Sequence, residues 1–173
     1  LQVIGVTGTN GKTSTVQLTS QLAALLNKRA ASIGTLGSGV IDQAGTCASH
    51  NDTANTTPDA ISMHKLMAQF VQDQVKQVAL EVSSHALVHG IADESLMLTD
   101  SEHQCLAKDV VYSNQGCRFR LLSSWGECEI QLSLLGRFNI FNALAAIASQ
   151  LCLGESLNDI AKLAHLLVPV TGR

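Results

Sequence analysis

Residues 5–13 read GVTGTNGKT and lie between a β-branched apolar stretch (residues 2–7, QVIGVT) and a stretch with helical periodicity (residues 12–27). A glycine-rich turn between a strand and a helix is typical of a phosphate-binding loop. The backbone N–H groups of such a turn and the positive end of the helix both face a bound anion. Lys12 is then expected to reach the β- and γ-phosphates, and the Thr13 hydroxyl to ligate Mg²⁺. This stretch predicts a P-loop-type α/β domain.

The loop departs from the general pattern G-x-x-x-x-G-K-[ST] at its first position. Val6 stands where that pattern has a glycine, whereas Gly8 and Gly11 remain. These two glycines let the backbone approach an anion without an intervening Cβ. The alternative is a chance Gly-Lys-Thr at the start of a helix, but the strand before the loop and the helix after it favour a phosphate site.

Strand and helix patterns alternate through the first half of the chain, which implies a parallel sheet with helices packed on it. The elements expected after the first helix are a strand at 30–33, a glycine-rich turn at 34–39, a polar loop at 42–55, a helix from 57 to about 73 and a buried strand at 75–82. Thr57, Pro58 and Asp59 have the form of a helix start, with a hydroxyl cap, a proline and an acid. The buried face of that helix is expected to carry Ile61, Leu66, Phe70 and Val71.

The second half of the chain changes character. Three short strands separated by turns predict an antiparallel meander at residues 108–113, 118–123 and 129–134. Two helices are expected after it, at residues 140–153 and, behind a serine cap, at 157–167. The predicted class is therefore α/β, with a P-loop-type, mostly parallel sheet flanked by helices and a small antiparallel meander.

Composition excludes several functional classes. Of the 173 residues 46% are hydrophobic and only 14% are charged, with a net charge of −3. A disordered chain, a coiled coil and a basic nucleic-acid arm do not fit these values, and we expect no nucleic-acid partner. No apolar run approaches the roughly 20 residues of a membrane span, and no leader-like segment is visible, so a cytoplasmic protein is expected. The five cysteines are scattered, which predicts thiols rather than a disulfide framework.

Glu81 ends the buried run QVALE, and the carboxyl end of a strand is where ligands bind in such sheets. It is expected to be a second Mg²⁺ ligand; the alternative is an acid that faces solvent or has a structural partner. His85 and His89 suggest a zinc pair, but Ala86 stands where the metalloprotease motif needs glutamate. A serine nucleophile at Ser83 lacks a third, orienting group.

Five stretches together resemble the Mur ligases, the ATP-dependent amino-acid ligases of cell-wall peptidoglycan synthesis. They are TGTNGKT at 7–13, IGTLG at 33–37, NTTP at 55–58, EVSSHAL at 81–87 and LGRFNIFNALAA at 135–146. The last four point to the branch that adds the third residue of the stem peptide. The resemblance covers residues 1–173, but only the central ATP-binding domain of the family. We therefore expect the N-terminal UDP-binding domain and the C-terminal domain to be absent, with PVTGR at 169–173 as the exit towards the latter.

The resemblance implies a site for ATP and Mg²⁺. Its nucleotide-binding residues are Gly8, Thr9, Asn10, Gly11, Lys12, Thr13, Ser14, Asn139, Asn142 and Arg173. Lys12 and Glu81 are the expected catalytic residues, and Thr13 and Glu81 the expected Mg²⁺ ligands. The family places the two asparagines near adenine, and their alternative role is helix capping. The residues expected to contact the UDP-MurNAc-dipeptide are Thr56, Thr57, Ser83 and His89.

The family also implies the partners and the reaction. An acyl-phosphate forms on the dipeptide, and the amine of an incoming amino acid displaces the phosphate. The full-length enzyme is expected to be a monomer that takes the UDP-MurNAc-dipeptide and an amino acid, whereas the isolated domain is expected not to ligate. Two other interpretations stay open: another Mur or folylpolyglutamate-synthetase-type ligase, and a catalytically silent nucleotide-binding domain.

The resemblance breaks down after residue 90. The family continues with an arginine where this chain has Ile91, then with further parallel strands, an Asp-His segment and a carbamylated lysine that holds a second Mg²⁺. None of these can be found in the sequence. We therefore hypothesise that several tens of residues are absent between about 90 and 98.

Overall fold

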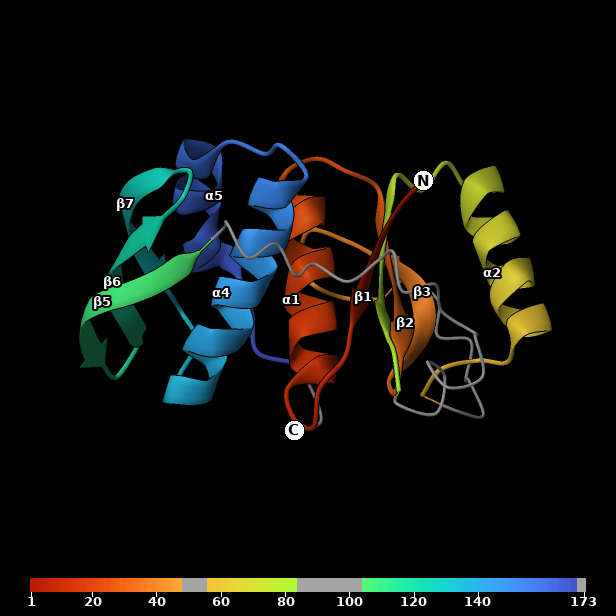
Figure 1. The fold of residues 1–173 in the computed structure, drawn as a ribbon, viewed down its shortest axis with the longest axis horizontal. Helices are drawn as coiled ribbons and strands as arrows, with labels where there is room; N and C mark the ends of the chain where they lie inside the picture. Colours follow the sequence, from red (N-terminus) through yellow and green to blue (C-terminus); the bar gives the residue numbers. More distant parts are fainter. Residues whose placement is uncertain (48–55, 84–103, 171–173) are drawn as a thin grey trace.

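The computed structural model describes residues 1–47, 56–83 and 104–170 of the chain (Figure 1). The strands in these ranges are β1 (Gln2–Val6), β2 (Ala30–Gly34), β3 (Gly37–Ile41), β4 (Gln77–Glu81), β5 (Cys105–Ser113), β6 (Gly116–Ser123) and β7 (Gly126–Leu132). The helices are α1 (Lys12–Leu25), α2 (Ala60–Gln72), α4 (Arg137–Cys152) and α5 (Leu157–Leu163), with a 3₁₀ turn at Ala164–Leu166. The predicted α/β class is confirmed. The suspected break at residues 90–98 lies outside the described residues.

Sheet A is parallel except at one edge. Its strand order is β1-β4-β2-β3, and β4 pairs in parallel with both β1 and β2. β3 returns antiparallel to β2 after a two-residue turn. The predicted glycine-rich turn at residues 34–39 is therefore wrong in its second half. Gly37, with φ 93°, begins a buried strand rather than continuing a loop.

The register of sheet A brings the carboxyl ends of three strands to one edge. Val6 at the end of β1 lies opposite Glu81 at the end of β4, and Ile33 of β2 lies opposite Leu80. The Val82 N–H donates to the Val6 carbonyl at 2.9 Å, so β1 and β4 stay paired up to the point where both leave the sheet. The segments that follow these strands therefore begin side by side.

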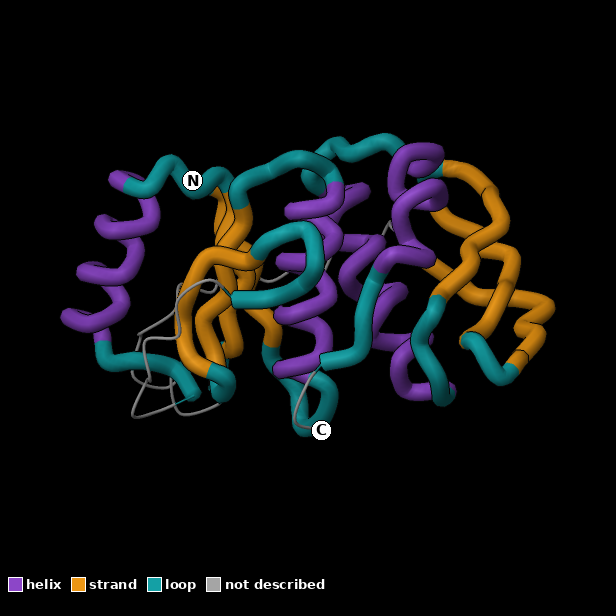
Figure 2. The backbone as a smooth tube through the Cα atoms, turned by 180° about the vertical axis from the view of Figure 1, so that it is seen from behind, coloured by secondary structure: helices purple, strands orange, loops and turns teal. Residues whose placement is uncertain are grey.

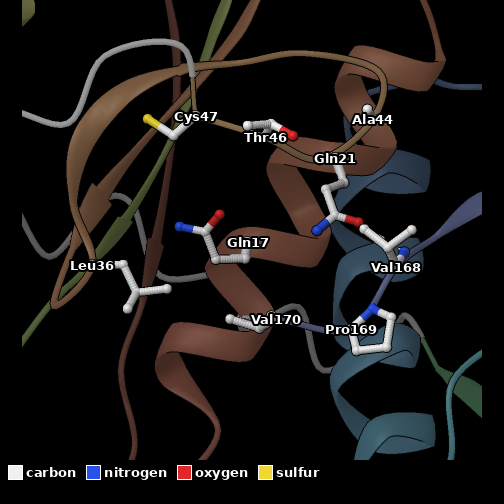
Figure 3. A pocket seen from close by; sticks show the side chains of 10 residues that line it. Gln17, Gln21, Leu36, Ala44, Thr46, Cys47, Val168, Pro169 and Val170 are labelled. Carbon is white, nitrogen blue, oxygen red and sulfur yellow. Dashed lines mark hydrogen bonds between the residues drawn. The ribbon is translucent and has the colours of Figure 1, made fainter. Parts of the chain in front are cut away.

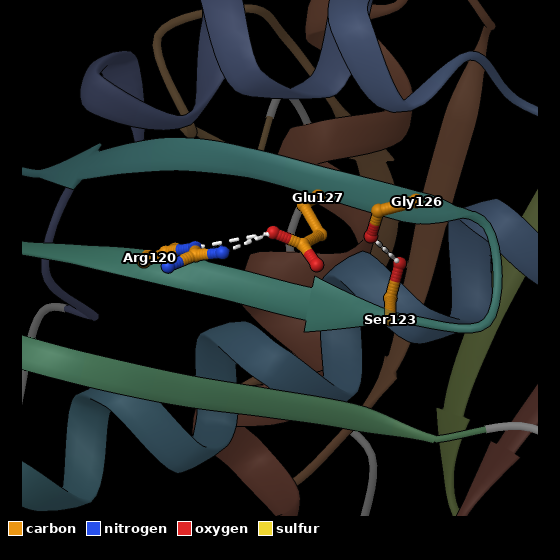
Figure 4. Close-up of polar contacts among 4 residues, drawn as sticks. All are labelled: Arg120, Ser123, Gly126 and Glu127. Carbon is orange, nitrogen blue, oxygen red and sulfur yellow. Dashed lines mark hydrogen bonds and ion pairs between the residues drawn. The ribbon is translucent and has the colours of Figure 1, made fainter.

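Sheet B is the predicted meander, with order β5-β6-β7. Side chains alternate along β6, so that Phe119 is buried and Arg120 is exposed. On the outer face the Arg120 Nε donates to Glu127 Oε2 at 3.1 Å (Figure 4). In the turn between β6 and β7, Ser123 Oγ donates to the Gly126 carbonyl at 2.8 Å. The meander is thus fixed by a buried inner face and by a short polar turn.

α1 lies between the two sheets, and its two sides differ in chemistry. Towards α4 and sheet B it contributes Leu18 and Leu22 to a hydrophobic core that includes Phe119. Towards sheet A it makes buried polar contacts: Gln17 Nε2 donates to Ser32 Oγ and Ser20 Oγ donates to the Ala31 carbonyl, both at 3.1 Å. Figures 1 and 2 show the resulting layers, with α2 on the far face of sheet A and α4 and α5 between α1 and sheet B.

α2 begins at Ala60, whereas the sequence predicts a helix from residue 57. Asp59, not Thr57, is its N-cap, since the Asp59 carboxylate accepts from the N–H groups of Ile61 and Ser62 at 3.0 Å. The hydrogen bond from the Ser62 hydroxyl, followed by those from the two backbone N–H groups, lowers the pKa of Asp59 below its ordinary value of 3.8. The expected buried face is partly wrong. Ile61 and Val71 are exposed, by 70% and 58%, whereas Phe70 is buried as expected and Met63 is buried against sheet A.

α4 and α5 lie where the sequence predicts two helices, but α5 ends at Leu163 rather than at residue 167 and continues as a 3₁₀ turn. α4 begins at Arg137, a few residues earlier than predicted, and ends before Gly154, which has φ 87°. Ser156 caps α5 as expected, its hydroxyl accepting from the Asp159 N–H at 3.4 Å. All five cysteines carry thiols in the structure. Among the described residues we find no helix of the length and apolar character that a membrane crossing requires.

Candidate functional site

The amino end of α1 is open for an anion. Gly11 precedes the helix in the left-handed conformation (φ 82°), which favours glycine because other residues are strained there. No side chain caps α1, and no acidic residue lies in its first turn. Residues 7–10 of the loop are exposed. Within the described ranges the first-turn N–H groups of this helix therefore have no side-chain acceptor, as a phosphate-binding helix requires.

Lys12 and Thr13 lie at this helix end as the sequence predicts. The Lys12 ammonium donates to the Gly8 carbonyl at 2.7 Å, so the side chain folds back across the loop. The Thr13 side chain is buried, at 2% exposure, beneath the loop. The lysine ammonium is thus held against the loop, where a phosphate bound on the same loop would meet it.

Glu81 lies at the same edge of sheet A and is almost fully buried, at 2% exposure. Its Oε1 accepts from the Thr35 N–H at 2.9 Å, and its Oε2 accepts from the Thr35 hydroxyl at 3.1 Å. Gly34 makes room for it, because a Cβ there would overlap the Glu81 carboxylate. The acid is therefore not a solvent-facing strand end. It is held in one place by the turn between β2 and β3.

The predicted substrate residues on the next segment connect to the same acid. Thr57 is buried, and its hydroxyl donates to the Glu81 carbonyl at 2.8 Å and accepts from the Ser83 N–H at 3.1 Å. Thr56 is half-buried, with its hydroxyl 3.3 Å from the Thr35 hydroxyl. The structure thus brings Thr56, Thr57 and Ser83 to the carboxyl end of β4. His89 and Arg173 lie outside the described residues.

A cavity of about 460 Å³ joins the phosphate loop to α4. Its lining residues are Asn10, Gly11, Ser14, Phe138, Asn139, Phe141, Asn142, Pro169 and Val170. The two asparagines predicted to lie near the base are therefore in one cavity with the loop predicted to hold the phosphates. Phe138 and Phe141, exposed by 84% and 56%, were not singled out from the sequence. The signal in the sequence was their position, since Phe138 and Phe141 each stand directly before one of the two asparagines.

Neither asparagine is a helix cap. The N-cap of α4 is Gly136, with no side-chain bond, whereas the Asn139 amide donates to the Leu135 carbonyl at 2.8 Å. Asn142 packs against the phosphate loop, where a Cβ on Gly11 would lie 2.6 Å from its Oδ1. The same oxygen accepts from the Thr15 hydroxyl at 3.4 Å. Asn142 therefore connects α4 to the first turn of α1, and its position is a second reason why glycine is needed at position 11.

A second cavity, of about 480 Å³, lies on the other side of the segment at residues 168–170 (Figure 3). It is lined by Gln17, Gln21, Leu36, Ala44, Gly45, Thr46, Cys47, Val168, Pro169 and Val170. The Gln21 Oε1 accepts from the Val168 N–H at 3.1 Å, which ties the end of the described chain to α1. The two cavities share Pro169 and Val170 in their walls.

The oxygen donors present fit Mg²⁺ rather than a softer metal. Thr13 and Glu81 offer a hydroxyl and a carboxylate at the edge where β1 and β4 end, and Mg²⁺ takes few protein ligands when phosphates supply others. In the described ranges no group of three or more histidine, cysteine or acidic side chains is placed to hold a metal. A zinc pair involving His85 and His89 falls outside these ranges.

Fold and site together define an α/β domain of the P-loop type. The sequence profile of a family described as the Mur ligase middle domain matches residues 6–99 and 90–150, so the chain belongs to this family. Two curated relatives are named UDP-N-acetylmuramoyl-L-alanyl-D-glutamate–2,6-diaminopimelate ligase. The one from Vibrio parahaemolyticus is 28% identical over 237 aligned positions, and the one from Alkalilimnicola ehrlichii 32% identical over 240. The chain spans 47% of the length of each of these relatives.

Solved structures agree on the fold. A structure named for the same ligase superposes with a TM-score of 0.82 at 22% identity, over 100% of this chain and 47% of that one. A folylpolyglutamate synthase from Thermotoga maritima superposes with a TM-score of 0.63 at 14% identity, over 99% and 59%. The predicted Mur ligase resemblance is therefore confirmed at the level of the domain family.

Proposed function

We propose that this chain is the ATP- and Mg²⁺-binding middle domain of a ligase that adds the third amino acid to UDP-MurNAc-L-Ala-D-Glu. The observation that carries this is the shared cavity between the phosphate loop and α4, with Glu81 held at the adjacent strand end. Support for the substrate comes from the two curated relatives, which are named as ligases of that UDP-linked dipeptide and 2,6-diaminopimelate. Whether this chain serves diaminopimelate or lysine addition depends on domains outside it.

In this proposal the residues of the chain bind and position the reactants. The N–H groups of the loop and the Lys12 ammonium hold the β- and γ-phosphates, and Asn139 and Asn142 lie beside the base. Bound Mg²⁺, held by Thr13 and Glu81, would neutralise charge on the transferring phosphoryl group. That group passes to the D-glutamate side-chain carboxylate, and the amine of the incoming amino acid then displaces phosphate from the acyl-phosphate. Alignment of the reactants and charge neutralisation are most of what this chemistry requires.

We also propose that the active enzyme contains residues that this chain lacks near positions 90–98. Two observations support this: the two family matches both include residues 90–99, and the alignments extend to 237 and 240 positions for a chain of 173 residues. A second metal ligand set would then belong to the absent segment and to flanking domains. The isolated chain is expected to bind nucleotide and not to ligate. The full-length protein is expected to be a monomer in the bacterial cytoplasm, where its thiols stay reduced.

A second candidate is a ligase of the folylpolyglutamate synthase kind, favoured by the structural similarity alone. The relatives at 28% and 32% identity favour the muramoyl substrate. A catalytically silent nucleotide-binding domain is the third candidate. Turnover by the full-length protein with either UDP-MurNAc-dipeptide or a folate separates all three, since the silent domain turns over neither.

The binding test uses a fluorescent ATP analogue and Mg²⁺ with Lys12→Ala, and Lys65→Ala as the matched control. Lys65 is an exposed lysine of α2, the helix that Figure 1 shows on the far side of sheet A from α1. A charged hydrogen bond contributes about 1.5–3 kcal/mol, so Lys12→Ala should weaken binding roughly 10- to 100-fold while the control leaves it unchanged. Equal affinity of the wild-type chain and Lys12→Ala would contradict the nucleotide site.

A further inference from the structure

The Thr35 hydroxyl is placed between the candidate metal ligand and a candidate substrate residue. Its Oγ1 lies 3.1 Å from Glu81 Oε2 and 3.3 Å from Thr56 Oγ1. The Thr35 N–H independently holds Glu81 Oε1 at 2.9 Å. Glu81 is buried, Thr56 is half-buried and Thr35 is exposed, so the hydroxyl that links the other two groups lies at the surface.

A threonine hydroxyl has one proton and two acceptor lone pairs, so Thr35 cannot donate to both neighbours at once. When it donates to Glu81, its own oxygen can accept the Thr56 proton, and the chain of bonds runs from Thr56 through Thr35 to the carboxylate. When it donates to Thr56, the Thr56 hydroxyl no longer donates to Thr35 and can donate its own hydrogen bond to another acceptor. The three groups therefore form a hydrogen-bond chain with two possible directions.

We propose that Thr35 is a positioning residue that couples the Mg²⁺–nucleotide site to the UDP-MurNAc-dipeptide site by reversing this chain. The inference rests on the proposed function, because it takes Glu81 as metal ligand and Thr56 as substrate contact. A cation on the Glu81 carboxylate withdraws electron density from Oε2 and makes it a poorer acceptor. Thr35 then donates to Thr56, and the Thr56 hydroxyl is free to donate to the substrate.

The residues around it keep this hydrogen-bond chain in place. Gly34 leaves the Glu81 carboxylate room beside the turn, and the Thr35 N–H bond to Oε1 does not depend on the hydroxyl proton. Thr57 holds the end of β4 through the Glu81 carbonyl and the Ser83 N–H, so Thr56 is anchored by its neighbour in the sequence. Only the direction of the hydroxyl protons changes, with no movement of the backbone.

The test measures binding, not turnover, in the full-length protein that carries this chain. The dissociation constant of UDP-MurNAc-L-Ala-D-Glu is determined by calorimetry without nucleotide and with Mg²⁺ and a non-hydrolysable ATP analogue. The ratio of the two constants is the coupling factor. We expect a factor of about five or more in the wild type, the lower end for coupled sites.

Two substitutions separate the hydroxyl from the side-chain shape. Thr35→Val keeps the shape and the N–H but removes the proton, so the coupling factor should fall to about one while each ligand still binds alone. Thr35→Ser keeps the hydroxyl and should restore the coupling. Thr56→Val interrupts the chain at its other end and should also abolish the coupling.

Three outcomes would overturn the inference. Coupling that survives in Thr35→Val, or that Thr35→Ser fails to restore, would show that the hydroxyl does not carry it. Equal weakening of both affinities in Thr35→Val, with an unchanged ratio, would show a structural role only. A wild-type protein that binds the Mg²⁺–nucleotide and not the dipeptide, or neither, would overturn the proposed function itself, and this inference with it.

Discussion

Substitution of Gly34 by alanine tests whether the Glu81 carboxylate keeps its position because Gly34 has no Cβ. A Cβ at this position would overlap Glu81 Oε1 and lie 2.7 and 2.8 Å from its Cγ and Cδ. The backbone of Gly34 is ordinary strand and the carboxylate is buried, so the carboxylate must move. Both bonds from Thr35 would then break. At about 1.5 kcal/mol for each bond, the low end for a charged partner because Thr35 is exposed, the loss is about 3 kcal/mol.

The matched control is the same substitution in a Glu81→Ala background. Glu81→Ala removes the three atoms that lie nearest to the new methyl group, and Gly→Ala at a compatible site stabilises by about 0.4–1 kcal/mol. The effect of Gly34→Ala on the free energy of unfolding should therefore change sign between the two backgrounds. Urea denaturation followed by circular dichroism measures all four variants, and the double-mutant cycle gives the coupling energy. An equal loss in both backgrounds would refute the contact, because strain would then lie in the backbone.

Three further predictions concern the loop, a cap and the thiols. Gly11→Ala should lower the free energy of unfolding by about 2 kcal/mol, because Gly11 is left-handed and a Cβ there would lie 2.6 Å from Asn142 Oδ1. Adding Asn142→Ala should recover only the part of this loss that comes from the contact with Asn142, in the same urea assay. The pKa of Asp59 is lowered in the folded chain, so its contribution is present above about pH 4 and is lost as the pH falls through the folded value. Asp59→Ser, a cap that does not titrate, should therefore show less loss of melting temperature in acid, and identical acid profiles would contradict the capping role. Iodoacetamide should modify exposed Cys152 first and Cys117 last in peptide mass spectrometry, because burial raises the pKa of the Cys117 thiol; the reverse order would exclude this explanation.

Local chemistry made part of this site readable from the sequence. The phosphate loop needs glycine, lysine and threonine at fixed spacing, and Glu81 ends an apolar run whose alternation with a helix implies a parallel strand. The positions of such residues can be predicted from the local sequence pattern alone. The alternating pattern of the meander was readable for the same reason, since one face of β6 is buried and the other is not.

Other features depend on partners far away in the sequence. Gly37 and the residues after it were expected to form a turn, yet they pair with β2, because strand pairing and burial outweigh the low strand propensity of glycine. Thr57 was expected to cap α2, but its hydroxyl binds the end of β4, and Asp59 takes the capping role. The role of Thr35 could not be read from its neighbours, since its acceptor is the side chain of Glu81, on another strand.

The two unlike sides of α1 have a thermodynamic consequence. One side shares an apolar core with sheet B and α4, while the other is attached to sheet A through buried hydrogen bonds of Gln17 and Ser20. A ligand that binds only the folded chain adds RT ln(1 + [L]/Kd) to its stability, about 2.7 kcal/mol at a hundredfold excess over Kd. Since that ligand would act at the first turn of α1, which packs against both halves, amides in sheet A and in sheet B should gain hydrogen-exchange protection together. The two halves would then open as a single cooperative unit when nucleotide is bound, although the described strands form two separate sheets.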